Sequence, residues 1–275
     1  MTQSSDPASP KLARFPLRLD QLDRQNRSPA LTRKAFHPAT GPATQTQLQG
    51  KSAGLGLDSA KVRQRMVQRL EEQGALHDAV RQALLQVERH RFVDTALAGQ
   101  AYEDTSLPIG LSQTISKPSV VARMLSLLCE GAAARQSGHL GRVLEIGTGC
   151  GYQAALLCVL GRKVVSVERL LPLFEKARDN LAVWRIGSDL QLVHGDGRLG
   201  HGPKAPYQSI IAAAGGDALP PAWLDQLAEG GRLVAPVLDG RHGAQVLCVV
   251  DRGAEGLVTR YEEAVLFVPL RSGTE

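Results

Sequence analysis

The sequence lacks the features that mark membrane-spanning, disulfide-bonded and metal-binding proteins. No stretch of its 275 residues approaches the roughly 18 consecutive apolar residues of a membrane span, and the N-terminus has no apolar signal-peptide core. It has only four cysteines, which form neither a CxxC pair nor a group with nearby histidines: Cys129, Cys150, Cys158 and Cys248. We therefore expect a soluble cytoplasmic protein with no membrane partner, no bound metal and buried, reduced thiols.

An excess of one charge is also missing from most of the chain. The net charge is +5, but residues 1–60 hold 8 Lys and Arg against 4 Asp and Glu, whereas the remainder holds 24 against 23. A domain this close to neutral is not expected to carry a nucleic-acid groove, so we expect no specific nucleic-acid partner. The hydrophobic content of 43% is ample for a buried core.

The beginning of the chain lacks the periodicity of a helix or a strand. Residues 1–56 contain six of the fifteen prolines and are rich in Ser, Thr, Gln and Arg, which predicts a disordered N-terminal extension over 1–57. The arginines leave a transit peptide as an alternative for its first part, although Asp6, Asp20 and Asp23 count against that reading. The folded domain is then expected over 58–275.

The most informative stretch lies between residues 142 and 161. Val143, Leu144 and Ile146 form a short apolar run typical of a buried parallel strand. Glycines follow at positions 147, 149 and 151, where they allow a tight turn and a close backbone approach to a ligand. Residues 152–160, which end at Gly161, then predict a helix whose N-terminus points at that ligand.

The spacing of these glycines separates two kinds of nucleotide ligand. A dinucleotide fingerprint requires Gly-x-Gly-x-x-Gly, but here the third glycine comes one residue early, and Tyr152 occupies the place of Gly or Ala. Glu145 precedes the first glycine by two positions. A second acid, Glu168, ends the next apolar strand about 20 residues after the loop, where such folds hold a ribose diol. This arrangement resembles the first motifs of the class I S-adenosylmethionine-dependent methyltransferases.

A second resemblance is more specific. Leu107-Pro108-Ile109-Gly110, followed by Gln113-Thr114-Ile115-Ser116 and by Pro118, lies just before a predicted helix and ahead of the glycine loop. This segment is similar to one in the protein-L-isoaspartate O-methyltransferase family. The similarity extends over about residues 60–271, and its other matching segments are 89–94, 144–149, 166–169, 194–197 and 267–270.

The resemblance implies a site and its ligands. Ser116 aligns with the active-site serine of the family, and S-adenosylmethionine, without a metal, is the implied cofactor. The implied cofactor-binding residues are Gln113, Thr114, Glu145, Gly147, Thr148, Gly149, Gly151, Glu168, Asp196 and Gly197. The implied substrate is the free carboxylate of L-isoaspartyl residues in damaged proteins and peptides, whose methylation starts repair through a succinimide. Since a carboxylate is already ionised near neutral pH, Ser116 would orient it rather than act as an activated nucleophile.

Patterns along the rest of the chain predict an α/β fold with an open, mostly parallel seven-stranded sheet and an antiparallel edge. The resemblance implies that this is a Rossmann-like class I methyltransferase domain. Asp58 is a candidate N-cap for a helix over 59–73, and a second helix from Asp78 belongs to the same small helical cap over 58–100. Residues 99–117 show no helical stripe and are expected to be irregular and functional. Further helices are expected over 118–129, 173–184 and 220–230, and further strands over 190–193, 209–214, 232–238, 244–250 and 258–267.

The chain departs from the family pattern at three positions, where Cys150, Gln208 and Ala213 replace the more usual Ser, Asp and Thr. These changes leave the predicted cofactor acids intact and affect the pocket wall near 212–216. Three other functions remain open: a methyltransferase for a small molecule or nucleic acid, a non-catalytic cofactor-binding protein, and a nicotinamide oxidoreductase. The glycine spacing disfavours the last, and the absence of an Asn/Asp-Pro-Pro-aromatic motif after the fourth strand disfavours a base methyltransferase. We expect a monomer.

Deleting residues 1–56 is expected to leave the specific activity of methyl transfer largely intact, because no predicted site residue lies in the extension. Initial rates of the truncated and full-length chains, measured at equal concentrations of folded protein, test this expectation. A large loss of activity in a truncated protein that still unfolds cooperatively would show that the extension belongs to the working enzyme.

Overall fold

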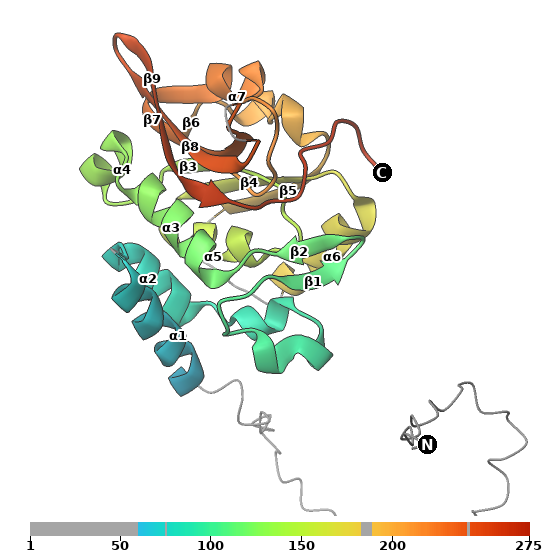
Figure 1. The fold of residues 1–275 in the computed structure, drawn as a ribbon. Coiled ribbons are helices and arrows are strands. Elements are labelled where there is room, and N and C mark those ends of the chain that lie inside the picture. Colours follow the sequence, from blue (N-terminus) through green and yellow to red (C-terminus); the bar gives the residue numbers. More distant parts are fainter. Residues whose placement is uncertain (1–59, 75, 183–188, 241–242) are drawn as a thin grey trace, which may run out of the picture. The chain divides into compact units, whose positions relative to one another are not determined.

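The computed structural model describes residues 60–74, 76–182, 189–240 and 243–275 (Figure 1). The expected extension over 1–57, the Asp58 N-cap and the expected helix end at 183–184 lie outside the described residues. No helix in the described ranges is long and apolar enough to cross a membrane, and no group of His, Cys, Asp and Glu in them could hold a metal ion. All four cysteines lie in these ranges and are buried, reduced thiols, as expected.

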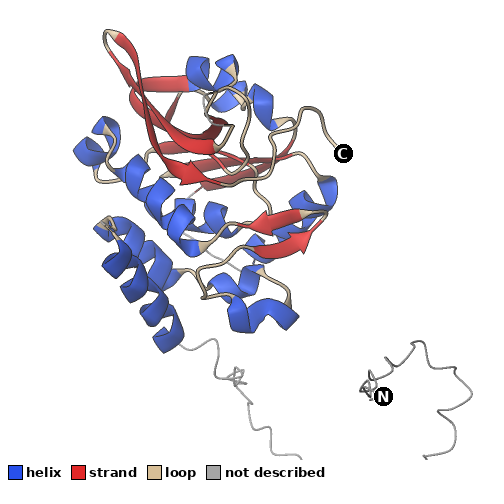
Figure 2. Cartoon of the chain, in the orientation of Figure 1, coloured by secondary structure: helices blue, strands red, loops and turns tan. Residues whose placement is uncertain are grey.

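The centre of the fold is a mixed seven-stranded sheet (Figure 2). In sheet order its strands are β5 (Asp189–His194), β4 (Lys163–Glu168), β3 (Arg142–Ile146), β6 (Tyr207–Ala212), β7 (Leu227–Leu238), β8 (Gln245–Gly253) and β9 (Gly256–Val265). The first five run parallel, whereas β8 pairs antiparallel with both β7 and β9. The predicted α/β class, with its mostly parallel sheet and antiparallel edge, is confirmed.

Both faces of the central parallel strands β3, β4 and β6 are buried, which explains the apolar runs in these strands. Along β3, Val143 faces one core and Leu144 the other, as the alternation of side chains in a strand requires. The first core includes residues of α3 (Pro118–Cys129), α5 (Tyr152–Leu160) and α6 (Leu171–Ala182), and the second includes Trp223 of α7 (Pro221–Gln226). A short helix, α4 (Ala132–Ser137), lies between α3 and β3 in the chain. The helices predicted over 118–129 and 152–160 have these bounds in the structure.

Before the sheet the chain forms a group of helices. It contains α1 (Ala60–Gln73), α2 (Asp78–Gln86) and two 3-10 helices, Arg89–Phe92 and Thr95–Gln100. Helix α2 begins after His77, whose Nδ1 accepts a hydrogen bond from the backbone N–H of Ala79 at 3.2 Å. It packs against α3 and α5, so these helices cover the face of the sheet on which the first core lies.

The segment 99–117 contains a β-hairpin, so the expectation of an irregular segment was wrong in part. Strand β1 (Leu107–Gly110) pairs antiparallel with β2 (Gln113–Ile115). Both residues of the turn have left-handed backbones, with φ of 52° at Leu111 and 56° at Ser112. This conformation is uncommon for residues other than glycine, asparagine and aspartate. The strands are too short to show an alternating pattern, and the two turn residues are not the Asn-Gly or Asp-Gly pair typical of such hairpins, so no local pattern predicts this hairpin.

The helix predicted over 220–230 is a second expectation that the structure corrects. Helix α7 ends at Gln226, and strand β7 begins at the next residue and runs through Gly230 and Gly231. Against β6 the register shifts, because Tyr207 pairs with Leu227 but Ser209 pairs with Arg232. Gly230, with φ of 73°, lies in this bulge. The glycine pair interrupts a strand rather than ending a helix.

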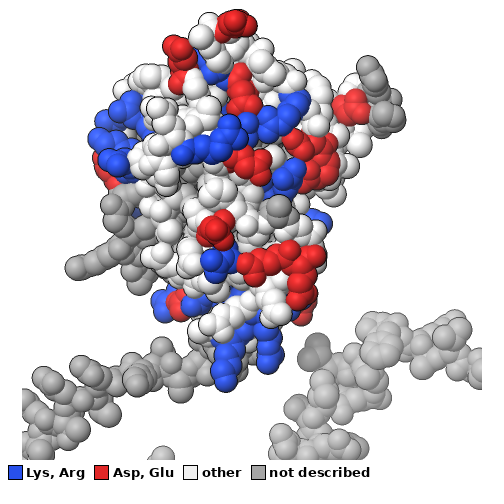
Figure 3. Space-filling model, turned by 90° about the vertical axis from the view of Figure 1, so that its left-hand side faces the viewer, with Lys and Arg blue, Asp and Glu red and all other residues white. Residues whose placement is uncertain are grey.

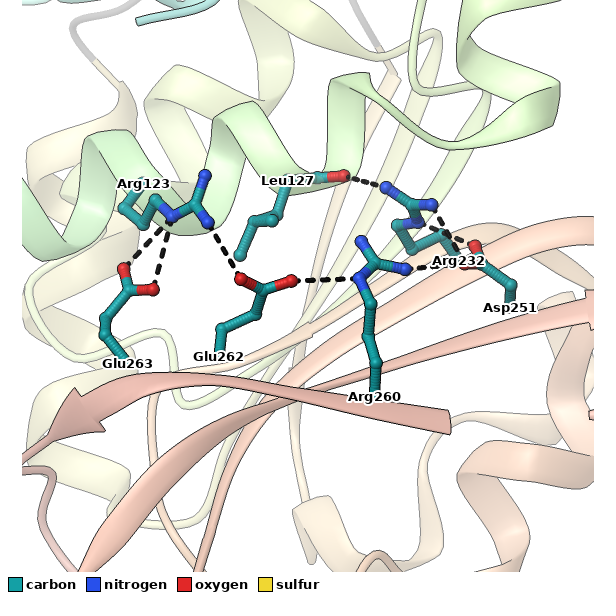
Figure 4. Close-up of polar contacts among 7 residues, drawn as sticks. All are labelled: Arg123, Leu127, Arg232, Asp251, Arg260, Glu262 and Glu263. Carbon is teal, nitrogen blue, oxygen red and sulfur yellow. Dashed lines mark hydrogen bonds and ion pairs between the residues drawn. The ribbon is translucent and has the colours of Figure 1, made fainter. Parts of the chain in front are cut away.

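A network of charged side chains joins α3 to the antiparallel edge of the sheet (Figure 4). Arg232 of β7 donates two hydrogen bonds to the carboxylate of Asp251 in β8, from Nε at 2.6 Å and from Nη2 at 2.8 Å. Its Nη1 donates a third to the carbonyl oxygen of Leu127 in α3 at 2.8 Å. Arg260 of β9 donates to the same carboxylate at 2.9 Å. Asp251 therefore neutralises a buried arginine and connects three strands.

The charged side chains continue from this network toward the start of α3. Arg260 also donates to Glu262 at 2.9 Å, and Arg123 of α3 pairs with Glu262 at 3.0 Å and with Glu263 at 3.1 Å. The face drawn in Figure 3 shows positive and negative side chains interspersed, without a broad field of one sign. Because α3 begins two residues after Ser116, these contacts hold the helix that follows the predicted catalytic residue.

Replacing Asp251 by Asn is expected to lower the free energy of unfolding at neutral pH by about 1–3 kcal/mol, because hydrogen bonds to charged groups are lost. Burial raises the pKa of Asp251, but the hydrogen bonds and charges of Arg232 and Arg260 outweigh burial and hold the pKa below its usual value. A carboxylate with a lowered pKa stabilises the folded state above its unfolded pKa, so the difference between variant and wild type should shrink as the pH falls below about 4.

Urea unfolding of the two proteins across this pH range measures the effect. Glu263→Gln, at the more exposed end of the network, is the matched control and should change stability by less than about 0.5 kcal/mol. Equal effects of the two substitutions would contradict the central place given to Asp251.

Candidate active site

A cavity of about 690 Å³ opens at the carboxyl ends of β3 and β4. Its walls come from the β1–β2 hairpin, the glycine loop after β3, the first residues of α5, the end of β4 and the C-terminal tail. In open parallel sheets, ligands bind at this edge. The volume lies within the usual range of ligand pockets, about 300–1,000 Å³.

The glycine loop adopts the conformation that its sequence predicts. Gly147, Gly149 and Gly151 have φ of 88°, 56° and 92°, a left-handed region that other residues rarely enter. Space is short as well: a Cβ atom on Gly149 would lie 3.2 Å from Cδ1 of Ile109, and one on Gly151 would lie 2.9 Å from Cδ1 of Leu181. A larger residue would be strained at all three positions, and at Gly149 and Gly151 a neighbouring side chain would also have to shift. The loop leads directly into the N-terminus of α5.

Glu168 holds this loop from the neighbouring strand. Its Oε2 accepts a hydrogen bond from the backbone N–H of Gly149 at 2.9 Å, and its Oε1 accepts one from that of Leu170 at 3.0 Å. The side chain lines the cavity although Glu168 is only 5% exposed. Each carboxylate oxygen keeps a second lone pair, so the same group can anchor the loop and accept a hydrogen bond from a ligand.

Glu145 lies beneath the loop and is not among the residues that line the cavity. It is fully buried, and its Oε2 accepts a hydrogen bond from Oγ of Ser166 at 2.5 Å, which in turn lies 2.6 Å from Oγ1 of Thr148. Burial raises the pKa of Glu145 to about 8, although the hydrogen bond from Ser166 opposes the shift. The carboxyl group is therefore mostly protonated at neutral pH and reaches the loop through Ser166 and Thr148.

Gln113 and Thr114 of β2 and the following Ser116 all line the cavity. Nζ of Lys176 in α6 donates a hydrogen bond to the carbonyl oxygen of Ile109 at 3.0 Å, which ties the hairpin to α6. The hairpin thus brings Ser116 to the same cavity as the glycine loop and Glu168, from positions far apart in the sequence.

The sequence left open whether Ser116 caps the helix that follows it. In the structure the N-cap of α3 is Lys117, whose side chain makes no capping bond. Oδ1 of Asp104 accepts the hydrogen bond from the backbone N–H of Ser119 at 2.8 Å instead. No local capping pattern marks Asp104, because it lies 15 residues before Ser119. The Ser116 side chain is therefore not used as the cap.

Gly197 lines the cavity, whereas Asp196 lies next to it and outside the lining. Oδ1 of Asp196 accepts a hydrogen bond from the backbone N–H of Arg198 at 2.8 Å, and Oδ2 accepts one from that of Gly273 at 2.7 Å. Asp196 thus caps the 3-10 helix Gly197–Leu199 and binds the C-terminal tail.

The C-terminal tail is a part of the site that the sequence did not reveal as such. Residues 268–271 and Glu275 line the cavity. Gly215 holds the tail through two backbone hydrogen bonds, one donated to Val268 at 2.9 Å and one accepted from Leu270 at 2.7 Å. Arg169 pairs with Glu275 at 3.0 Å. The match of residues 267–270 to the family motif marks this segment in the sequence, but it does not indicate that the segment lines the cavity.

The three residues that depart from the family pattern lie in different places relative to the cavity. Ala213 and Cys150 line the cavity, and Cys150 is buried. Gln208 lies at the opposite end of β6, where its Oε1 accepts a hydrogen bond from the backbone N–H of Arg142 at 2.7 Å. Gln208 therefore supports the pairing of β3 with β6 and does not shape the cavity.

The residues present fit S-adenosylmethionine. The glycine loop gives close backbone access next to a helix N-terminus, and Glu168 supplies an acceptor at the end of the adjacent strand. Gln153 also lines the cavity, and its buried Nε2 has no hydrogen-bond partner in the part of the chain that the structure describes. An unpartnered buried donor in a cavity wall is a place for a ligand oxygen.

Comparison with known proteins agrees with this geometry. The family model described as "Protein-L-isoaspartate(D-aspartate) O-methyltransferase (PCMT)" matches residues 61–275. The chain is 58% identical to the protein-L-isoaspartate O-methyltransferase of Methylibium petroleiphilum, over 95% of this chain and 97% of that protein. It is 53% identical to the corresponding protein of Leptothrix cholodnii, over 98% of both.

Two solved structures resemble the fold. A protein-L-isoaspartate O-methyltransferase, 28% identical, has a TM-score of 0.64 over 75% of this chain and 65% of that one. A putative protein-L-isoaspartate O-methyltransferase from Plasmodium falciparum, in complex with S-adenosyl-L-homocysteine, has a TM-score of 0.63 over 76% of this chain and 98% of that one; at 22% identity it supports the fold alone. The chain belongs to the protein-L-isoaspartate(D-aspartate) O-methyltransferase family of class I S-adenosylmethionine-dependent methyltransferases.

Proposed function

We propose that the chain transfers the methyl group of S-adenosylmethionine to the free carboxylate of L-isoaspartyl residues in proteins and peptides. The observation that carries this proposal is the cavity in which the hairpin residues Gln113, Thr114 and Ser116 meet the glycine loop and Glu168. The relatives from M. petroleiphilum and L. cholodnii, which match nearly the whole chain, are named for this activity.

The residues of the loop and its neighbours would hold the cofactor. The backbone of residues 147–151 would bind its amino-acid part near the N-terminus of α5, and Glu168 would accept hydrogen bonds from the ribose hydroxyls. Gly197 and Asp196 would bind the adenine end, and Asp196 also holds the tail through Gly273. Glu145 acts indirectly, because it supports Thr148 through Ser166. When bound, S-adenosylmethionine supplies an electrophilic methyl group on a sulfonium ion.

The chain's own part in the reaction is to bind, orient and exclude water. The isoaspartyl carboxylate is already ionised at neutral pH, so neither a general base nor a metal ion is needed to generate the nucleophile. The hydroxyl of Ser116 donates a hydrogen bond that fixes this carboxylate. Apolar side chains such as Ile109, Val121 and Leu173 line the cavity, and they lower the polarity around charges that disappear as the methyl group moves.

Glu168→Ala is expected to weaken binding of S-adenosylmethionine by about 10- to 100-fold, as the loss of hydrogen bonds to a charged group predicts. The variant loses both the anchor of Gly149 and the proposed ribose contact. Isothermal titration calorimetry measures the affinity, and Glu175→Ala on the exposed face of α6 is the matched control. Unchanged affinity in a folded Glu168 variant would rule out this role.

Methyl transfer to two peptides that differ only in an L-isoaspartyl or an L-aspartyl linkage tests the function itself. Base-labile label is expected in the isoaspartyl peptide alone. Ser116→Ala should lower kcat by about 10- to 100-fold and change the KM for S-adenosylmethionine by less than about 3-fold, because the lost hydrogen bond acts on the substrate carboxylate.

The possible outcomes separate the alternatives. Equal labelling of both peptides, or none despite tight cofactor binding, would contradict the proposed substrate. A normal kcat in Ser116→Ala would contradict the role of Ser116 without affecting the assignment of the substrate.

A further inference from the structure

Arg89 is a fully buried arginine directly behind the wall of the cavity. It is 0% exposed, although it carries a charge that is costly to remove from water. Its Nε donates to the carbonyl oxygen of Ala101 at 2.8 Å, and its Nη2 donates to the carbonyl oxygen of Ser116, also at 2.8 Å. The guanidinium carbon lies 4.9 Å from the centre of the Tyr152 ring. Arg89 opens the segment 89–94, which matches the family pattern but has no role in the proposed reaction.

These contacts connect the two halves of the site. Ser116 lines the cavity on the hairpin side, and Tyr152 lines it on the cofactor side, where it is the first residue of α5 directly after the glycine loop. The planar guanidinium directs its N–H groups in fixed directions, so one side chain sets the position of the Ser116 backbone relative to the start of α5. The backbone of Ser116 in turn determines where its hydroxyl points.

The energetic argument favours a role beyond packing. Removing a charged group from water is costly, and even a buried ion pair often stabilises a protein no more than apolar residues of the same volume. A buried arginine whose bonds go to backbone carbonyls is therefore a poor way to gain stability, but a good way to fix two segments in one geometry. Methyl transfer between two bound partners depends on such alignment, and a displacement of about 1 Å can cost about 100-fold in rate.

We propose that Arg89 is a positioning residue for methyl transfer, which holds the carbonyl of Ser116 and the ring of Tyr152 so that Ser116 presents the substrate carboxylate to the methyl group. This inference rests on the proposed function. It assigns Arg89 no contact with substrate or cofactor, and the effect of Arg89 on the reaction passes through Ser116.

The test uses the full chain with the isoaspartyl peptide and compares Arg89→Lys, Arg89→Met, Ser116→Ala and the double variant Arg89→Lys/Ser116→Ala. Arg63→Lys is the matched control, because Arg63 also donates from Nε to a backbone carbonyl, that of Leu85 at 2.6 Å, and does not line the cavity. For each protein, kcat, both KM values and the thermal midpoint are measured.

Arg89→Lys should lower kcat by about 10- to 100-fold with a KM for S-adenosylmethionine within about 3-fold of wild type, because lysine cannot reproduce the two fixed bonds. Arg63→Lys should keep kcat within about 2-fold of the wild-type value, even if its thermal midpoint falls by as much as that of Arg89→Lys. Arg89→Met should lose kcat as well, and its thermal midpoint should fall, because the carbonyl oxygens of Ala101 and Ser116 lose their buried donor. When Ser116→Ala is already present, adding Arg89→Lys should lower kcat by less than about 3-fold, because Arg89 affects the reaction only through Ser116.

Three results would overturn the inference: an unchanged kcat in a folded Arg89→Lys or Arg89→Met, an equal loss of kcat in Arg63→Lys, or effects of Arg89→Lys and Ser116→Ala that multiply fully in the double variant. Failure of the proposed function is distinguishable, because the wild type would then not methylate the isoaspartyl peptide, and the inference would fall with it.

Discussion

The structure depends on one constraint, the left-handed glycine loop between β3 and α5. The positive φ values of this turn strain any residue other than glycine, and a Cβ atom on Gly149 or Gly151 would also press on Ile109 or Leu181. The loop alone would be free to move, and the carboxylate of Glu168 fixes it through the N–H of Gly149. Parallel pairing of β3 with β4 brings Glu168 to that position. The pairing of these two strands therefore positions the Glu168 carboxylate against the glycine loop.

The other two segments that line the cavity come from parts of the sequence far from this loop. The β1–β2 hairpin comes from before the sheet and is tied to α6 by Lys176, and the C-terminal tail comes from after the last strand and is tied by Gly215, Asp196 and Arg169. Both segments line the same cavity as the glycine loop. Enclosure from both ends of the chain suits a reaction in which charge is lost, because such a reaction is favoured where water is excluded.

The sequence predicted those parts of the fold and site that local patterns determine. The glycine loop, Glu168, helix α3 and helix α5 follow from glycine spacing, apolar runs and a proline at a helix start, and they were placed correctly. The hairpin was missed because its strands are short and its turn uses Leu111 and Ser112 in a backbone conformation that favours glycine. The bulge at Gly230 was mistaken for a helix end, since the same residues serve both purposes. The tail, Asp104 and the support of Thr148 by Glu145 depend on contacts between distant segments, which no local pattern records.

The buried polar side chains show what those distant contacts achieve. Arg89, Glu145 and Arg232 are each almost entirely removed from water. Each arginine binds groups on two separate segments, and Glu145 binds Ser166, which in turn contacts Thr148. Apolar residues at these positions could fill the same volume, but they would allow neighbouring segments to slide, because apolar contacts have no fixed direction. Hydrogen bonds to a carbonyl or a hydroxyl have a direction, and leaving one unmade in the interior is costly. The polar groups therefore favour a single arrangement of hairpin, loop and helix, and a reaction that needs two reactants in line depends on that arrangement more than on any one catalytic group.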